Sequence, residues 1–369
     1  MRKLWAGIGI LLLAVTGVSS VSYGEDAKLR IFVVSSYHRE YLWSQDTNKG
    51  LCAALRDFKF LDNDQQVEEY TKNDLVETAT VVIKKAWMDT KRKNKKDEIA
   101  ATTTSLVADI RAFKPDLVML GDDNATNFIG AYLANTAVPV VFWGVDFNPM
   151  TYGYLDSKEH PGHNVTGVYQ SGYFKEALEV LKKLYPDIKT FAILSDASET
   201  GRAKSKEIVR LAQAGQLPLE LVDQAATNSF SEWKDKAQEL SHKVDAFFVV
   251  NHGTLKDDKG AAVDSLQAGA WYLANIKKPE ASPEKQFVQE GMLLTADDSG
   301  YKQAYEAGRM VDLILHQKKS PADIAVIAPT RGVVIVNRQR AAILGVDVTG
   351  KAYIEEFIEK AAALEKYPQ

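Results

Sequence analysis

The stretch DLVMLGDDNATNFIGAYLANTAVPVVFWGV, residues 116 to 145, decides the fold class. It holds two short apolar runs, 116–122 and 138–145, and a helix-like segment lies between them. Two buried strands joined by a helix favour parallel pairing within one sheet. The same alternation precedes this stretch, with an apolar run at 29–36 and a helix pattern at 44–58. The sequence therefore predicts a three-layer α/β unit.

A second unit of the same plan follows. The segment 146–163 is rich in Pro and Gly and is the best candidate for a domain boundary. Strand patterns that alternate with amphipathic helix patterns then return at 164–170, 190–196, 219–226 and 245–253. The predicted fold class is α/β, with two Rossmann-like lobes and parallel sheets.

The last hundred residues contain single elements, which we interpret as returns that complete the two sheets and form a multi-crossing hinge. The C-terminal segment is expected to form a helix packed on the surface. The predicted division of the chain is a signal peptide at 1–24, a first lobe of 25–145 plus 292–318, a second lobe of 146–291 plus 319–350, and the C-terminal helix at 351–369.

Three segments have weaker patterns. We expect a polar strand at 67–72 and a long helical region from about 78 to 113. The charge run KRKNKKDE, residues 91–98, is interpreted as a solvated bend that splits this region, and a partner surface is the alternative. Residues 278–290 lack the apolar strand that would be expected before a return crossing.

The N-terminus has the order of a secretory signal. Arg2 and Lys3 precede an apolar stretch at 4–15, and small polar residues follow it. We predict cleavage before Glu25 and a periplasmic location, with an uncleaved anchor as the alternative.

Composition limits the classes of partner. The chain has 369 residues and a net charge of -4, which argues against nucleic acid or an anionic membrane as the main partner. A single cysteine, Cys52, excludes an internal disulfide and a cysteine metal cluster. Cys52 lies in a helix pattern and is expected to pack as a small hydrophobe. We predict a monomer that binds no metal and no cofactor.

Polar bursts follow several of the predicted strands. The carboxyl ends of parallel strands meet at one edge of a sheet, where α/β proteins place their ligands. We therefore expect two such edges to face a shared cleft. The ligand-binding residues predicted on this basis are Tyr37, His38, Trp43, Asp122, Asp123, Asn124, Trp143 and Asp146 in the first lobe, Ser195, Asp196, Ser198, Asn251 and His252 in the second, and Asp298 near the hinge.

Each of these side chains has a second interpretation. Three positions are also good helix N-caps: Asp123 or Asn124, Ser198, and Asp298 or Ser299. Aromatic residues such as Trp143 serve equally well in a core. As ligand-binding groups, aromatic faces would hold a flat or apolar part, and aspartates would pair with an ammonium group. The expected ligand is a small polar or aromatic compound that carries an amine.

Catalytic motifs are absent from the sequence. His38, His163 and His252 are scattered, without metal-ligand spacing. Neither a nucleophile elbow nor a Walker motif is present. We predict no enzymatic activity and no catalytic residues, although an extracytoplasmic hydrolase built from Asp and His on these loops stays open as an alternative.

Four segments resemble the substrate-binding proteins of ABC transporters, of the tryptophan- and tyrosine-binding type: VPVVFWGVDFNP at 138–149, PGHNVTGV at 161–168, AYEAGRMVDLILHQKKSPADIAV at 304–326 and VIVNRQRAAILGVDV at 334–348. The resemblance spans almost the whole mature chain in order. It implies a type I periplasmic-binding-protein fold. The first-strand exit of the family falls at Ser36, Tyr37 and His38. Its next loop falls on residues 121–124, where two aspartates replace small residues.

The resemblance also implies a function. A solute-binding protein of an ABC importer captures its ligand by hinge closure and delivers it to a permease in the inner membrane. The segment SSYHREYLWSQDTNKGL at 35–51 is similar to the opening of extracytoplasmic sensor domains of the same fold. A ligand-sensing partner of a membrane sensor kinase is therefore the alternative function.

Overall fold

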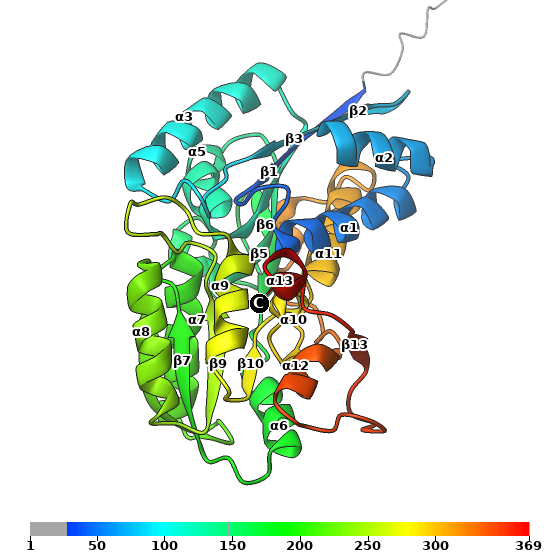
Figure 1. The fold of residues 1–369 in the computed structure, drawn as a ribbon. Helices are drawn as coiled ribbons and strands as arrows, with labels where there is room; N and C mark the ends of the chain where they lie inside the picture. The colour runs from blue at the N-terminus through cyan, green and yellow to red at the C-terminus, as the bar shows by residue number, and fades with distance from the viewer. Residues whose placement is uncertain (1–27, 147, 369) are drawn as a thin grey trace, which may run out of the picture.

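A computed structural model of the chain describes residues 28–146 and 148–368. The predicted signal peptide lies outside these residues. Two α/β lobes, each built on one sheet, stand one above the other (Figure 1). Among the described helices, none combines the length and the apolar character needed to cross a bilayer.

The first lobe has a six-stranded sheet in the order β2-β3-β1-β4-β5-β6. The strands predicted around residues 29–36, 116–122 and 138–145 are confirmed as β1, β4 and β5. Neighbours pair in parallel except β2, which is antiparallel to β3. The strands are β1 (Leu29–Ser35), β2 (Leu75–Glu77), β3 (Val81–Trp87), β4 (Leu117–Gly121), β5 (Val140–Asp146) and β6 (Val165–Gln170).

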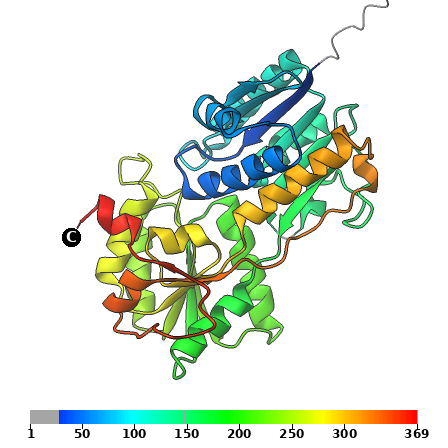
Figure 2. The ribbon, with the colours of Figure 1, turned by 90° about the vertical axis from the view of Figure 1, so that its right-hand side faces the viewer.

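Helices cover both faces of this sheet (Figure 2). One face packs against α1, α2 and α11 through residues such as Leu51 and Met310, and the other packs against α3 and the helical segment after β4 through Leu106 and Ile129. These elements are α1 (Leu42–Asp57), α2 (Asp64–Asn73), α3 (Lys96–Phe113), α4 (Asp122–Asn124), the π-helix η1 (Ala125–Ile129), α5 (Gly130–Leu133) and α11 (Gly300–Leu315), with the short η2 (Pro149–Tyr152) after β5.

The second lobe has a seven-stranded sheet in the order β13-β12-β11-β10-β9-β7-β8. It is also mixed, because β12 runs antiparallel to β11. The strands are β7 (Thr190–Ser195), β8 (Glu220–Ala226), β9 (Ala246–Asn251), β10 (Glu280–Ser282), β11 (Leu294–Ala296), β12 (Val334–Asn337) and β13 (Glu356–Ile358).

Apolar residues fill both faces of the second sheet as well. Leu178 and Ile208 contribute to the core on one face, and Trp233 and Tyr272 to the core on the other. The helices are α6 (Phe174–Leu184), α7 (Glu199–Gln213), α8 (Phe230–Ser241), α9 (Ser265–Asn275), α10 (Lys285–Glu290), α12 (Arg338–Ile343) and α13 (Ala362–Lys366), with η3 (Pro321–Asp323) between α11 and β12.

Two expectations for the first lobe were wrong. Residues 67–72 belong to α2, whose start is fixed by the Asn63 side chain accepting a hydrogen bond from the Gln66 N–H. The expected helix from 78 begins instead as β3, where buried and half-buried residues alternate along the strand. Alternation with period two suits a strand, and β3 pairs with β1 from Val81 onward. The helix itself starts only at Lys96.

Two expectations for the second lobe also need correction. The C-terminal segment forms β13 and the short α13 rather than one helix. Residues 278–290 do contain a strand, β10, although it carries Glu280. That carboxylate is fully buried and forms an ion pair with Arg340, with 2.9 Å between Nη2 and Oε2. A charged group can be buried when it has a partner of opposite charge. Because Glu280 interrupts the apolar run of β10, the strand was not recognised from the sequence.

Three segments connect the lobes, between β6 and α6, between β11 and α11, and between η3 and β12 (Figure 2). They are hydrogen-bonded to one another. Asp298 of the second segment accepts a bond of 2.8 Å from the Gly172 N–H of the first, and the Asp297 carbonyl accepts one of 2.8 Å from the Gly332 N–H of the third. By sheet membership, β6 lies with the first lobe and β11 with the second, so the crossings are shifted from the boundaries that we expected.

The packing of α1 against α11 gives a test of the fold. A Cβ atom at Gly50 would lie 2.1 Å from the backbone oxygen of Tyr301. In an open helix, Gly→Ala favours folding by about 1 kcal/mol. We expect Gly50→Ala to destabilise the protein instead, by about 1–3 kcal/mol, because backbone cannot yield as a side chain does. Urea unfolding measures the change, with the exposed Lys49→Ala on the same helix as control. A variant as stable as the wild type would contradict this packing.

Candidate functional site

The carboxyl ends of strands from both sheets face one another between the lobes. A space of about 20 Å³ lies there, roughly the room needed for one water molecule. The cleft is thus nearly filled by side chains of the two lobes. The residues that line this space are Tyr37, Tyr41, Trp43, Lys91, Gln170, Thr200, Lys204, Val250, Asn251, Glu284, Gln286 and Phe287.

Asp122 is held at the end of β4 by an unusual backbone conformation. Its φ angle is 67°, in the left-handed region that residues other than glycine rarely adopt. Gly144 of β5 makes room for its carboxylate, because a Cβ there would lie 2.5 Å from Asp122 Oδ1. The same oxygen accepts a hydrogen bond of 2.6 Å from the Trp43 indole N–H. Backbone strain of this kind accompanies functional sites in many proteins.

Asp123 connects the two lobes. Within the first lobe its carboxylate accepts hydrogen bonds from the Asp146 N–H at 3.1 Å and from the Tyr152 hydroxyl at 2.8 Å. From the second lobe, the Thr200 hydroxyl on α7 donates to it at 3.4 Å. The Thr200 hydroxyl also lies 3.1 Å from that of Tyr37.

Asp146, at the end of β5, has a different partner. Neither of its carboxylate oxygens accepts a hydrogen bond from the described residues. The Lys204 ammonium group, on α7 of the second lobe, lies 3.7 Å from Asp146 Oδ1 and also contacts the Glu284 carboxylate. All three side chains are almost completely buried. An ion pair thus crosses the cleft out of contact with water.

A group of aromatic side chains closes the cleft beside these acids. Gln286 of α10 accepts a hydrogen bond of 3.0 Å from the Trp43 backbone N–H and donates one of 2.9 Å to the Tyr41 hydroxyl. The buried Lys91 ammonium lies 4.2 Å from the centre of the Tyr37 ring. These aromatic faces can therefore hold a cation.

Burial shifts the pKa values of this site strongly. Desolvation raises the pKa of Asp122 from 3.8 to about 7. The Asp123 charge adds a smaller increase, and the hydrogen bond from Trp43 lowers the pKa in part. Burial also raises the pKa of Asp146 well above its ordinary range, and the Asp123 charge adds to the shift. Burial lowers the pKa of Lys91. Each shift reflects the cost of holding a charge away from water.

The structure brings six of the predicted residues to the interface between the lobes. Five lie at the ends of β1, β4 and β5 or on α1, and one lies at the end of β9. They are Tyr37, Trp43, Asp122, Asp123, Asp146 and Asn251.

Other predicted residues have local structural roles. The Trp143 ring is buried in the core of the first lobe and packs on Gly121. Asn124 donates a hydrogen bond of 3.0 Å to the Thr90 hydroxyl. Ser195 donates to the carbonyl of Asp196, within its own strand end.

The remaining predicted residues flank the cleft or support it. Asp196 accepts hydrogen bonds from Ser198 and from the Thr254 N–H, and Ser198 is the N-cap of α7. His252 is fully buried, with its Nε2 atom 2.7 Å from Glu290 Oε2 but without the alignment of a hydrogen bond. At the edge of the cleft, His38 Nδ1 lies 3.4 Å from Asp89 Oδ1. Asp298 lies in the connecting segment between β11 and α11.

Several residues that line the cleft were not predicted from the sequence: Tyr41, Lys91, Gln170, Thr200, Lys204, Glu284 and Gln286. Lys91 begins the charge run that we interpreted as solvated, yet its side chain is buried. Lys204 lies on an ordinary amphipathic helix. The residues around Lys204 in the sequence form no recognisable binding motif. Thr200 follows the N-cap of that helix, so its place in the first turn after a strand end was the one available signal.

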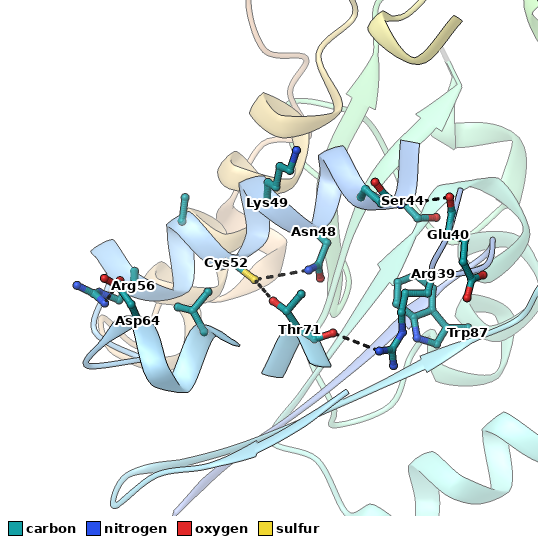
Figure 3. A pocket seen from close by; sticks show the side chains of 13 residues that line it. Arg39, Glu40, Ser44, Asn48, Lys49, Cys52, Arg56, Asp64, Thr71 and Trp87 are labelled. Atoms are coloured by element: carbon teal, nitrogen blue, oxygen red, sulfur yellow. Dashed lines mark hydrogen bonds and ion pairs between the residues drawn. The ribbon is translucent and has the colours of Figure 1, made fainter. Parts of the chain in front are cut away.

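Larger cavities lie outside this site. One of about 370 Å³ opens at the edge of the cleft, between residues such as His38 and Tyr41 and residues such as Val263 and Ser265. Another, of about 630 Å³, lies on the flank of the first lobe between α1 and α2 (Figure 3). Its arginines are paired locally, Arg56 with Asp64 and Arg39 with Asp74. This flank cavity belongs to one lobe, so a molecule bound there would not link the two.

The arrangement of the cleft suits binding. Among residues 28–146 and 148–368, no three His, Cys, Asp or Glu side chains are grouped so that they could hold a metal ion. The cleft instead combines aromatic faces, hydrogen-bonding groups and buried carboxylates from two lobes. Such a mixture fixes the orientation of a small polar molecule.

A model of the family described as ABC transporter substrate binding protein matches residues 65–358. The chain belongs to this family of binding proteins. The tyrosine-binding protein of Clostridioides difficile (strain R20291) is 25% identical over 236 residues, which are 64% of this chain and 65% of that relative.

Solved structures show the same two-lobe fold. One is the ABC domain from Streptococcus pneumonia in complex with L-Trp, with a TM-score of 0.68 and 21% identity over 90% of this chain and 100% of that one. Another is the ligand-free, open structure of a substrate-binding protein with adhesive properties from Clostridium difficile. It has a TM-score of 0.63 and 20% identity over 90% of this chain and 99% of that one. The type I periplasmic-binding-protein fold that we predicted is confirmed.

The raised pKa of Asp122 predicts a pH-dependent stability. Between about pH 4 and pH 7 the folded carboxyl keeps a proton that the unfolded chain has lost, so stability falls as the pH rises through this range. Asp122→Asn keeps the acceptor for Trp43 and removes the titration. We expect the variant to gain stability relative to the wild type across this range, by up to about 4 kcal/mol.

Urea unfolding at a series of pH values measures this difference. The exposed Asp258→Asn is the matched control, and its curve should run parallel to that of the wild type. A wild-type curve parallel to that of Asp122→Asn would show that Asp122 ionises normally in the folded protein.

Proposed function

We propose that this protein is an extracytoplasmic solute-binding protein that captures a small amine-bearing ligand by closure of its two lobes and delivers it to an ABC importer. The observation that carries the proposal is the set of desolvated carboxylates at the strand ends of the first lobe, Asp122, Asp123 and Asp146. Buried carboxylates are stable only with positive partners or donors.

The charge of the cleft favours a cationic ligand group. These three aspartates and Glu284 are buried there together with the ammonium groups of Lys91 and Lys204. Acidic groups therefore exceed basic groups in the described cleft. A primary ammonium group could replace the protons that the raised pKa values of Asp122 and Asp146 favour in the empty cleft, and it would bring three hydrogen-bond donors.

The aromatic residues favour a ligand with a flat or apolar part. Tyr37, Tyr41 and Trp43 form one cluster of buried side chains beside the acids. An aromatic amino acid combines a ring with an ammonium group. The names of the tyrosine-binding relative and of the L-Trp complex support this class as the first to be tested.

Closure of the lobes is the proposed mechanism of capture. The contacts of Gln286 with Trp43 and of Thr200 with Asp123 join groups from opposite lobes. The remaining space of about 20 Å³ is too small for an amino acid, so the lobes must separate to admit one. A ligand that contacts both lobes then favours the closed state by the difference in its affinity for the two conformations.

The cellular setting follows from the same proposal. A monomer released into the periplasm would take up its ligand there and dock on a permease of the inner membrane. The family match supports the transport role.

Matched ligand pairs test the amine requirement. L-Tryptophan, L-tyrosine, tryptamine and tyramine carry the ammonium group, whereas indole-3-propionate and 3-(4-hydroxyphenyl)propionate lack it. We expect at least one amine to raise the melting temperature and the deaminated analogues to leave it unchanged. A ligand at 100 times its Kd adds about 2.7 kcal/mol of stability. Differential scanning fluorimetry measures the shift.

A variant should separate the site from unspecific binding. Asp146→Asn removes a buried negative charge and is expected to weaken the binding of the amine more than tenfold, as measured by calorimetry, while Asp258→Asn leaves it unchanged. Equal shifts from an amine and from its deaminated analogue would refute the proposed ligand class.

A further inference from the structure

The cleft already contains a primary ammonium group. Lys204 extends from α7 of the second lobe, and its ammonium lies 3.7 Å from Asp146 of the first. Lys204 is 3% exposed. The Asp146 carboxylate accepts no hydrogen bond from the described residues, so the facing Lys204 ammonium is its counter-charge in the closed protein.

This pair leaves no room for a second cation. The space beside Lys204 and Gln286 amounts to about 20 Å³. Two ammonium groups in front of the same carboxylate would also repel each other strongly in a desolvated cleft. A ligand amine can therefore reach Asp146 only if the Lys204 ammonium moves away.

Glu284 provides the place to which Lys204 can move. It lies at the start of α10, in the same lobe as Lys204, and it already contacts the ammonium. Glu284 is also buried. Lysine has a flexible four-carbon stem, so its ammonium can give up Asp146 and stay paired with Glu284. The exchange leaves neither carboxylate without a positive partner.

We infer that Lys204 is a specificity-determining residue whose ammonium occupies the position of the ligand ammonium and holds the empty cleft closed. The inference rests on the proposed function for the ligand class. A cationic ligand that displaces Lys204 replaces one ammonium with another at Asp146, whereas a neutral or anionic ligand that displaces Lys204 would leave that carboxylate buried without a positive partner. Lys204 thus selects for amines and lowers their apparent affinity, because each must compete with it.

The first arm of the test needs no ligand. Nitroxide labels are placed at Lys93→Cys and Asp258→Cys in a Cys52→Ser background. Both labelled positions are exposed, and they lie on facing loops where the Asn94 side chain donates to the Thr254 carbonyl across the cleft. Pulsed electron paramagnetic resonance then measures the distance between the lobes. We expect Lys204→Met to increase the population of long distances.

Variants of neighbouring charges serve as controls in this arm. Asp146→Asn should open the cleft as Lys204→Met does, and Lys204→Arg should restore the closed distance. Lys206→Met removes an exposed charge from the same helix and should change nothing. Circular dichroism checks that each variant is folded. An unchanged distance distribution in folded Lys204→Met would overturn the inference.

The second arm measures the Kd of tyramine and L-tyrosine by calorimetry. If Lys204 keeps about nine-tenths of the empty molecules closed, Lys204→Met should bind these amines about tenfold more tightly than the wild type. Weaker binding by Lys204→Met would overturn the inference, because Lys204 would then contact the ligand itself. If neither amine binds any of the proteins, the proposed ligand class fails, and the distance measurements still decide whether Lys204 closes the cleft.

Discussion

The carboxylates of Asp122 and Asp146 lie between the two lobes with almost no access to water. An ionised carboxylate in such a place costs several kcal/mol unless a positive group or a donor faces it. Each acid has a different answer. Asp122 accepts a hydrogen bond from the indole N–H of Trp43, and Asp146 faces the ammonium of Lys204 from the opposite lobe. Burial raises the pKa of both carboxyl groups. In the closure that we propose, the approach of the lobes and the pairing of the Asp146 carboxylate would therefore occur together.

The parallel sheets explain why acids gather here at all. Strands β1, β4 and β5 run in the same direction, so the residues that follow them share one edge. Local backbone then aims the side chains. The positive φ of Asp122 and the missing side chain of Gly144 bring one carboxylate over the end of the neighbouring strand.

Much of the fold could be predicted from the sequence, because buried strands such as β4 and β9 are continuous apolar runs. The pattern failed where charge was buried. Because β10 contains Glu280, it was not recognised as a strand, and Lys91 was interpreted as a surface residue although it is buried. A single sequence does not show which partner will neutralise a charge. The acids of the first lobe were predictable from their strand ends. Lys204 was not, because its role arises from the approach of two lobes that are far apart in the chain.

The three connecting segments limit how the two lobes could move relative to each other. Asp298 links the first and second connecting segments through the Gly172 N–H, and burial raises the pKa of its carboxyl. Gln303, in the first turns of α11, donates to the same side chain at 2.9 Å. The segments are therefore hydrogen-bonded to one another close to the cleft. In the closure that we propose, the lobes would rotate about these crossings while both sheets stay intact. A rotation about a fixed axis separates groups in proportion to their distance from it. In the proposed opening, the pair of Lys204 with Asp146 and the contacts of Gln286 would break together. The proposed closure would then be a two-state change that one ammonium group can bias.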